Sequence, residues 1–176
     1  MKNFMIFMVG TSGSGKTTIA RALAVELEKR NECKFQFIDG DEARAEFGGM
    51  FGYTYEERMK CNLATCVVSK YLLQNGISVI LAQVGAYEAM RAQVRNKFPE
   101  NYVEIYVKCS YEECARRDVK GYYAKQQRGE MENLNGANDT FEVPQNSNIV
   151  IDTERTSVED AVKIIISYLE THGYIV

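Results

Sequence analysis

The sequence predicts an α/β fold in which helices flank a five-stranded parallel sheet. Five short apolar segments alternate with longer segments whose apolar residues recur at helical spacing, which is the pattern of parallel strands joined by crossover helices. A glycine-rich turn follows the first apolar segment directly. The length of 176 residues suits a single domain, residues 1–176.

The expected strands are short, apolar and bounded by turn residues; they cover residues 4–9, 34–38, 77–84, 102–108 and 148–152. Between them, apolar periodicity predicts helices over residues 17–28, 54–73, 87–97, 110–117 and 156–170. Three of these helices begin with a hydroxyl residue followed by glutamate three positions later, which is a capping box; the pairs are Thr54 and Glu57, Ser110 and Glu113, and Thr156 and Glu159.

Residues 118–144 interrupt this alternation. The segment is polar, contains glycine and has a basic start. It is too long for a structureless connection in a compact domain. We therefore expect a mobile lid at about 118–144 with some helix of its own; a disordered surface insertion is the alternative.

Composition excludes several classes of protein. A net charge of −3 is unlike that of a strongly basic nucleic-acid binder. No apolar run reaches the length of a membrane span, so we expect a cytoplasmic protein with no membrane partner. Five cysteines without a Cys-x-x-Cys pair do not suggest a disulfide framework, and the lone His172 gives no support to a zinc site.

Residues 10–17, Gly-Thr-Ser-Gly-Ser-Gly-Lys-Thr, fit the whole P-loop pattern between a predicted strand and a predicted helix. Lys16 is expected to reach the β- and γ-phosphates, and the Thr17 hydroxyl to coordinate Mg²⁺. The predicted ATP-binding residues are Gly10, Ser12, Gly13, Ser14, Gly15, Lys16, Thr17 and Thr18. A GTPase would normally carry the base-reading motif Asn-Lys-x-Asp. The only Asn-Lys pair here, Asn96-Lys97, is followed by Phe98 and Pro99, so the aspartate of that motif is missing and a GTPase is excluded.

The carboxylates that a phosphotransferase needs come from Asp39 and Asp41. Both directly follow the second predicted strand and therefore lie at the carboxyl edge of the sheet, where parallel sheets bind ligands. We expect Asp39 to lie near the magnesium ion and Asp41 to orient or deprotonate an acceptor hydroxyl. The two roles can be exchanged, and a simple Asp-Gly turn is the alternative. Together with Lys16, these are the predicted catalytic residues, and Thr17 and Asp39 are the predicted metal ligands.

Segments 10–17 and 38–41, with Arg44, Arg58, Lys120-Gly121-Tyr122 and Pro144, resemble the adenylylsulfate (APS) kinase family. The resemblance runs from about residue 4 to 152. It implies a P-loop kinase fold, ATP and Mg²⁺ as cofactors, transfer of the γ-phosphate to a nucleotide's ribose 3′-hydroxyl, and a homodimer. It places Arg44 and Arg58 on the acceptor's anionic side, Lys120 in the lid over the phosphates, and Arg117 beside the ATP adenine.

Departures from the family pattern concentrate on the acceptor side. Tyr53 and Leu134 stand where the family has two phenylalanines, Cys61 replaces an asparagine, and Gly85-Ala86 replaces a Ser-Pro pair. Glu88 replaces an arginine, although Arg91 remains. The predicted acceptor-binding residues are Asp41, Arg44, Tyr53, Arg58, Arg91, Lys120 and Leu134.

These departures lead us to favour an offshoot of the family, cytidine diphosphoramidate kinase of bacterial capsule phosphoramidate synthesis. The first alternative is adenylylsulfate kinase of sulfate assimilation. Others are a kinase of another small alcohol, such as a sugar or a shikimate-like acid, and a nucleotide-binding module without turnover.

Overall fold

The computed structural model describes residues 2–176 and contains the predicted five-stranded parallel sheet. The strands are β1 (Met5–Val9), β2 (Phe35–Asp39), β3 (Ser78–Ala82), β4 (Tyr102–Lys108) and β5 (Ile149–Asp152). Their order across the sheet is β2-β3-β1-β4-β5, and every neighbouring pair is parallel. The P-loop strand β1 is therefore central, and β2, which ends at Asp39, lies at one edge.

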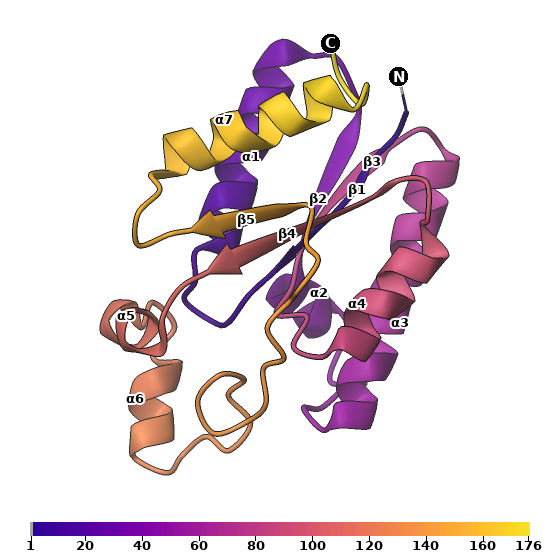
Figure 1. Cartoon of the computed structure of the whole chain (residues 1–176). Helices are drawn as coiled ribbons and strands as arrows, with labels where there is room; N and C mark the ends of the chain where they lie inside the picture. Colours follow the sequence, from indigo (N-terminus) through magenta and orange to yellow (C-terminus); the bar gives the residue numbers. More distant parts are fainter. Residues whose placement is uncertain (1) are drawn as a thin grey trace.

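Helices cover both faces of the sheet (Figure 1). On one face, α1 (Lys16–Arg30) packs beside α7 (Val158–Thr171), and both share a core with side chains of the sheet. On the other face, α3 (Tyr55–Gln74) contacts α4 (Glu88–Lys97) and β3. Cys66, Val94 and Phe98 bring these two helices into a second core with β1 and β3. Burial on both faces explains why the strands read as continuous apolar runs.

Two of the three predicted helix starts are confirmed. Thr54 and Glu57 form a complete capping box at the start of α3. Ser110 accepts a hydrogen bond from the backbone N–H of Glu113 at the start of α5 (Tyr111–Arg117). The third prediction is wrong by one residue: α7 begins after Ser157, whose hydroxyl accepts from the N–H of Asp160.

The sequence pattern did not predict α2 (Gly40–Glu46), a helix that follows β2 with no intervening loop. Asp39 is both the last residue of β2 and the N-cap of α2, because its carboxylate accepts hydrogen bonds from the backbone N–H groups of Asp41 and Glu42. Capping by aspartate satisfies amides that the first helical turn leaves free. This capping fixes the direction of the Asp39 side chain and places Asp41 in the first turn of α2.

The lid segment contains the short helix α6 (Tyr122–Gln127), which agrees with the prediction of some helix within residues 118–144. The carboxylate of Asp118 accepts from the backbone N–H groups of Tyr123 and Ala124, at 3.0 and 2.9 Å. Beyond α6 the chain returns to β5 without a further helix or strand. In Figure 1, α5, α6 and this returning chain gather at one end of the sheet.

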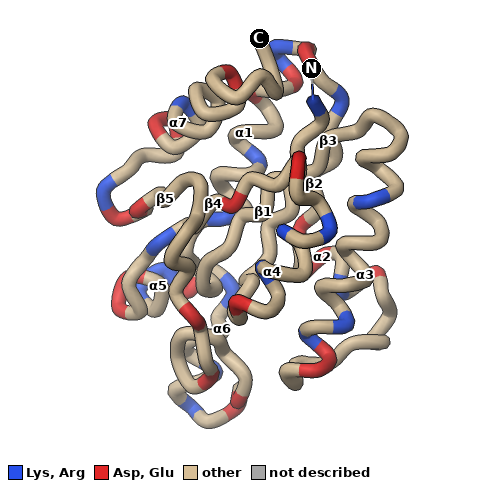
Figure 2. Tube along the Cα trace, turned by 45° about the vertical axis from the view of Figure 1, so that its right-hand side comes forward, with Lys and Arg blue, Asp and Glu red and all other residues tan. Residues whose placement is uncertain are grey.

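Charged residues are spread over the molecule. Basic and acidic positions are interspersed along the trace in Figure 2, in keeping with the net charge of −3. None of the helices within residues 2–176 combines the length and the apolar character required to cross a bilayer.

Candidate active site

A cavity of about 440 Å³ lies between the P-loop, the carboxyl ends of β2 and β3, and the lid. Most of the predicted site residues line it: Ser12, Gly13, Gly15, Lys16, Thr17, Thr18, Asp39, Asp41, Arg44, Tyr53, Arg58, Arg117, Lys120 and Leu134. Gly10, Ser14 and Arg91 are not among the lining residues. The fold thus brings the predicted ATP-binding and acceptor-binding residues around one space.

Glycine is required in the P-loop for two different reasons. A β-carbon on Gly10 would lie 2.4 Å from the carbonyl oxygen of Val107, so no side chain fits there. Gly15, the residue before α1, has a φ of 105°, which disfavours any other residue. The loop consequently runs close to β4 and leads into the N-terminus of α1 at the cavity, and a helix N-terminus favours anions.

Lys16 reaches back across this loop. Its Nζ donates 2.8 Å hydrogen bonds to the carbonyl oxygens of Gly10 and Thr11. Burial, and then the positive charge of Lys120, lower the pKa of Lys16 from its ordinary value of 10.5 to about 8. An anion bound in the loop would reverse this effect, since a negative charge favours the protonated ammonium group.

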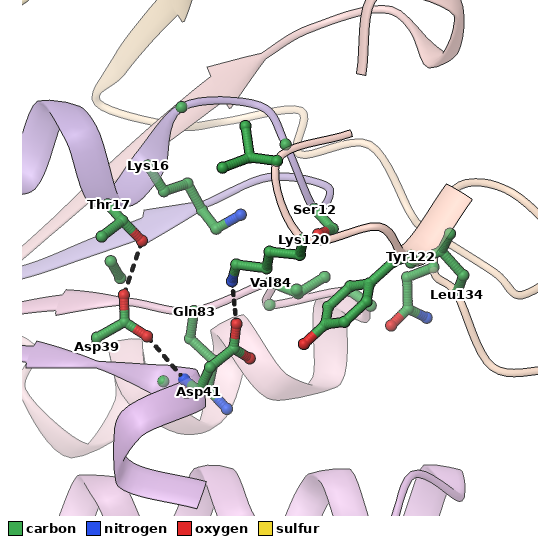
Figure 3. A pocket seen from close by; sticks show the side chains of 18 of the residues that line it. Ser12, Lys16, Thr17, Asp39, Asp41, Gln83, Val84, Lys120, Tyr122 and Leu134 are labelled. Atoms are coloured by element: carbon green, nitrogen blue, oxygen red, sulfur yellow. Dashed lines mark hydrogen bonds and ion pairs between the residues drawn. The ribbon is translucent and has the colours of Figure 1, made fainter. Parts of the chain in front are cut away.

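The Thr17 hydroxyl donates a 2.7 Å hydrogen bond to Oδ2 of Asp39 (Figure 3). Burial acts to raise the pKa of Asp39, but the hydrogen bonds from Thr17 and from the amides of Asp41 and Glu42 outweigh it and leave this pKa below its ordinary value. Asp39 is therefore an ionised, nearly buried carboxylate, with 8% of its surface exposed.

Thr17 and Asp39 fit a magnesium ion that arrives with a nucleotide. Mg²⁺ prefers oxygen ligands and is usually bound by one or two protein groups together with substrate phosphates and water. Within residues 2–176 there is no group of three or more His, Cys, Asp or Glu side chains that could hold a metal on their own. A hydroxyl and one carboxylate beside a phosphate-binding loop match the first arrangement.

Asp41 projects from the first turn of α2 and forms an ion pair with Lys120 of the lid segment (Figure 3). Burial acts to lower the pKa of Lys120, but the bond to Asp41 outweighs it and raises this pKa above its ordinary value. The pair joins positions 79 residues apart in the chain. Lid and sheet edge are thus connected directly over the cavity.

Two arginines frame Tyr53. The guanidinium of Arg44 lies 4.7 Å from the centroid of the Tyr53 ring, and that of Arg58 lies 5.4 Å from it. Arg58 is buried and donates to the carbonyl oxygens of Tyr53 and Asn133, at 2.8 and 2.6 Å. Arg58 therefore anchors the lid segment to α3, and the two cations keep the tyrosine ring at the cavity wall.

Arg117 and Leu134 lie on the lid side of the cavity. Arg117 donates 3.0 Å hydrogen bonds to the hydroxyl and carbonyl oxygens of Thr153 and a 2.8 Å hydrogen bond to Glu113. Leu134 is buried in a small cluster with Tyr123, whose hydroxyl donates to the carbonyl oxygen of Ser12 at 2.8 Å. The two neighbouring tyrosines therefore differ in position: Tyr122 lines the cavity, whereas Tyr123 is buried and packs the lid onto the P-loop.

Arg91 does not take the place that the resemblance gave it. It is buried, with 1% of its surface exposed, and its Nη1 donates a 2.7 Å hydrogen bond to the carbonyl oxygen of Gly85. Its Nε donates to Glu88 at 3.1 Å. Because the guanidinium is engaged beneath the loop after β3, the structure corrects Arg91 from an acceptor ligand to a support of that loop.

Sequence reasoning missed Gln83, which lines the cavity beside the two aspartates. It directly follows the last residue of β3, and it was not predicted because only a carboxylate was expected to act at the end of that strand. A polar residue at the carboxyl end of an otherwise apolar strand was the available signal.

The family description "Adenylylsulphate kinase" matches residues 2–152 of the chain. A protein of Aeropyrum pernix named "Probable adenylyl-sulfate kinase" is 38% identical over 172 residues, which cover 96% of this chain and 93% of that one. The "Adenylyl-sulfate kinase" of Halothermothrix orenii is 36% identical over 174 residues, 99% of this chain and 93% of that one.

Among solved structures, the Mycobacterium tuberculosis APS kinase CysC in complex with AMPPNP and APS superposes with a TM-score of 0.91. The superposition covers 96% of this chain and 98% of that chain at 23% identity. This likeness supports the fold.

Proposed function

The chain belongs to the adenylylsulphate kinase family, and from this premise we propose that it transfers the γ-phosphate of ATP to the 3′-hydroxyl of a nucleotide acceptor. One observation carries the proposal: a single cavity joins the P-loop lysine, the Thr17–Asp39 pair and the second carboxylate, Asp41. Phosphoryl transfer depends mainly on positioning and on neutralisation of charge, and this cavity provides for both.

In this proposal the P-loop amides and Lys16 bind the phosphates of ATP. Thr17, and Asp39 through water, would hold the magnesium ion that accompanies the nucleotide and neutralises part of its charge. Asp41 orients the acceptor hydroxyl. A bond forms between that oxygen and the γ-phosphorus while the bond to the bridging oxygen of ADP breaks, and Asp41 accepts the hydroxyl proton.

Lys120 has two partners in this scheme. It pairs with Asp41 in the structure. A polyanion in the P-loop competes for the same ammonium group, and the transfer of Lys120 to the phosphates frees Asp41 for the acceptor hydroxyl. The lid lysine then offsets the charge that develops on the transferred group.

For the acceptor, the names of the relatives favour adenylyl sulfate over our first expectation, cytidine diphosphoramidate. The same names favour a role in sulfate assimilation over one in capsule synthesis. Adenylyl sulfate is therefore the principal candidate. Arg44 and Arg58, beside Tyr53, supply the positive charge that the anionic side of either acceptor requires.

Cytidine diphosphoramidate stays as a second candidate because of the cavity wall. Leu134 and Tyr53 stand in place of two phenylalanines, and the Tyr53 ring already contacts the guanidinium groups of Arg44 and Arg58. One aromatic face with an aliphatic partner stacks a base more weakly than two aromatic faces do. A smaller base with more polar contacts suits such a wall.

Release of ADP with each acceptor in turn tests the proposal. Adenylyl sulfate, cytidine diphosphoramidate, gluconate and shikimate are compared at equal concentration, with Lys16→Ala as the inactive control. The proposal expects ADP formation that depends on one of the two nucleotides. Stimulation by gluconate or shikimate alone would favour a kinase of another small alcohol, and binding of ATP without any turnover would favour a nucleotide-binding module.

We also propose that the chain forms a homodimer. Leu63, Val67 and Tyr71 lie four residues apart on α3 and therefore share one face. All three are exposed, by 46%, 40% and 63%. Sedimentation velocity at micromolar concentration tests this proposal, and a monomer throughout that range would contradict it.

A further inference from the structure

Gln83 is a polar side chain that the structure buries without giving it a partner. Only 9% of its surface is exposed, and its Oε1 is fully buried with no hydrogen-bond partner within residues 2–176. Its backbone is fixed, because its N–H donates to the carbonyl oxygen of Met8 at 3.1 Å. A buried amide carbonyl without a partner is unfavourable to the folded state, which points to a ligand that completes it.

Gln83 lies beside the two aspartates, so a ligand group that reaches it is also close to them. Ala82, the residue before it, is the sheet partner of Asp39. A β-carbon on Gly40 would lie 2.9 Å from Cγ of Gln83, so this side chain packs against the residue between the two aspartates. Figure 3 shows Gln83 between Asp39 and Asp41 in the wall of the cavity.

The neighbouring polar groups are already engaged. Asp39 accepts from Thr17, Asp41 pairs with Lys120, and Arg44 donates to the carbonyl oxygens of Phe51 and Gly52. Gln83 thus offers an unused amide at the place where Asp41 would hold the reacting hydroxyl. A carboxamide carries both a hydrogen-bond donor and an acceptor, as a hydroxyl group does, so it can bind a hydroxyl of the acceptor other than the reacting one.

We propose that Gln83 binds the ribose hydroxyl next to the one that is phosphorylated, so that the site selects ribonucleotide over 2′-deoxyribonucleotide acceptors. The inference rests on the proposed function and adds a specificity residue to it. A site that is built to hydrogen-bond a hydroxyl discriminates against the analogue that lacks it, because its own polar group is then left unpaired.

The test compares the unchanged protein with Gln83 variants, each on an acceptor with and without the 2′-hydroxyl. Values of kcat/KM are measured for adenylyl sulfate, for cytidine diphosphoramidate and for the 2′-deoxy analogue of each. The unchanged protein should prefer the ribo form of its acceptor by about tenfold to a hundredfold, as one buried hydrogen bond implies. Gln83→Met should lower kcat/KM for the ribo form by that factor and leave the 2′-deoxy form unchanged.

Gln126→Met is the matched control. Oε1 of Gln126 is also buried without a partner, but Gln126 is on α6 and does not line the cavity. Its change should leave the ribo preference intact. Gln83→Asn, which keeps the amide but withdraws it by one methylene group, should lose the preference as Gln83→Met does, and it serves if the methionine variant does not fold.

The outcomes separate the two proposals. Gln83 variants that keep the full ribo preference, or that lower kcat/KM equally for ribo and 2′-deoxy forms, overturn the role of Gln83 alone. An unchanged protein that phosphorylates neither ribonucleotide contradicts the proposed function itself. A higher melting temperature of the ligand-free Gln83→Met protein would agree with the removal of an unpaired buried carbonyl, and a lower one would indicate a structural role and speak against the inference.

Discussion

Thr17 Oγ1 and Asp39 Oδ2 are joined by a 2.7 Å hydrogen bond that links the first turn of α1 to the end of β2. The two residues are 22 positions apart, and each is placed by a different device. Thr17 follows the P-loop lysine in α1, and Asp39 caps α2. A strand edge and a helix N-terminus are thereby brought together where the nucleotide's magnesium ion is expected.

Asp39→Asn tests this pair. Asparagine caps a helix about as well as aspartate, so the melting temperature should change little. The loss of charge should raise the magnesium concentration needed for half-maximal activity by about 10- to 100-fold. A magnesium titration of ADP release measures this. Asp160→Asn, at the exposed start of α7, is the control; a magnesium dependence that stays the same in Asp39→Asn would contradict the assignment.

Lys16→Ala should reduce kcat by about 10²–10³-fold or more, because the ammonium group is aimed at the charge that develops on the transferred phosphoryl group. Single-turnover transfer from labelled ATP measures the loss. Lys163→Ala is matched in chemistry, but the exposed Lys163 side chain lies on α7, where it pairs with Asp160. Comparable activity in both variants would remove the P-loop lysine from the mechanism.

The lowered pKa of Lys16, about 8, predicts uptake of protons when nucleotide binds. Near pH 8 about half of the nucleotide-free molecules carry an uncharged Lys16, and bound phosphates raise this pKa again. Binding of Mg–ADP should therefore take up about half a proton near pH 8 and about a tenth near pH 7, and affinity should fall as the pH rises through 8.

Calorimetry in buffers of different ionisation enthalpy measures this proton uptake. The two pH values serve as each other's control, since Lys16 is already charged at the lower one. Equal uptake at both, or release of protons at the higher pH, would contradict the shifted pKa.

Tyr53→Ala should weaken the acceptor and spare ATP. The ring lies at the cavity wall under Arg44 and Arg58, and loss of one stacking face costs about 1–3 kcal/mol per base. The KM for the nucleotide acceptor should rise by about 5- to 100-fold, while the KM for ATP stays within about twofold. Tyr168→Ala, on α7 and outside the cavity lining, is the control. An unchanged acceptor KM would exclude contact between the base and Tyr53.

Arg91→Met should act on stability and not on acceptor affinity. The change removes the hydrogen bond to Gly85 and leaves a buried carbonyl unpaired, at a cost of about 1–3 kcal/mol. In a chain of this size each kcal/mol lowers the melting temperature by about 2–4 °C. Arg95→Met, a half-exposed partner of the same Glu88, is the comparison. A large rise in acceptor KM at normal stability would restore Arg91 to the binding residues.

The strands, the main helices and the P-loop could be predicted because each is encoded in a short stretch of sequence. Strand 102–108 agrees at both ends with β4, and the capping box at Thr54 sets the start of α3. The start of α7 was missed by one residue because Thr156 and Ser157 are each followed by an acidic residue three positions later, so the local pattern fits both.

The contacts across the cavity could not be predicted in this way. The Lys120–Asp41 pair and the Arg58–Asn133 bond join segments 79 and 75 residues apart. The two short helices α2 and α6 are stabilised by the carboxylates of Asp39 and Asp118 more than by apolar periodicity. Arg91 was misplaced for a related reason. The sequence shows that an arginine is present, but only the fold shows that its guanidinium already donates to the carbonyl oxygen of Gly85 and to the carboxylate of Glu88.

The most direct test of the central claim is the position of the transferred phosphate. The protein is incubated with Mg–ATP and the nucleotide acceptor that it turns over, and the purified product is examined by phosphorus–proton correlation NMR. A new phosphomonoester coupled to the ribose H3′, formed in equal amount with ADP and absent with Lys16→Ala, is the predicted result. ADP formation without any new ester on the acceptor, or an ester at another position of the ribose, would contradict it.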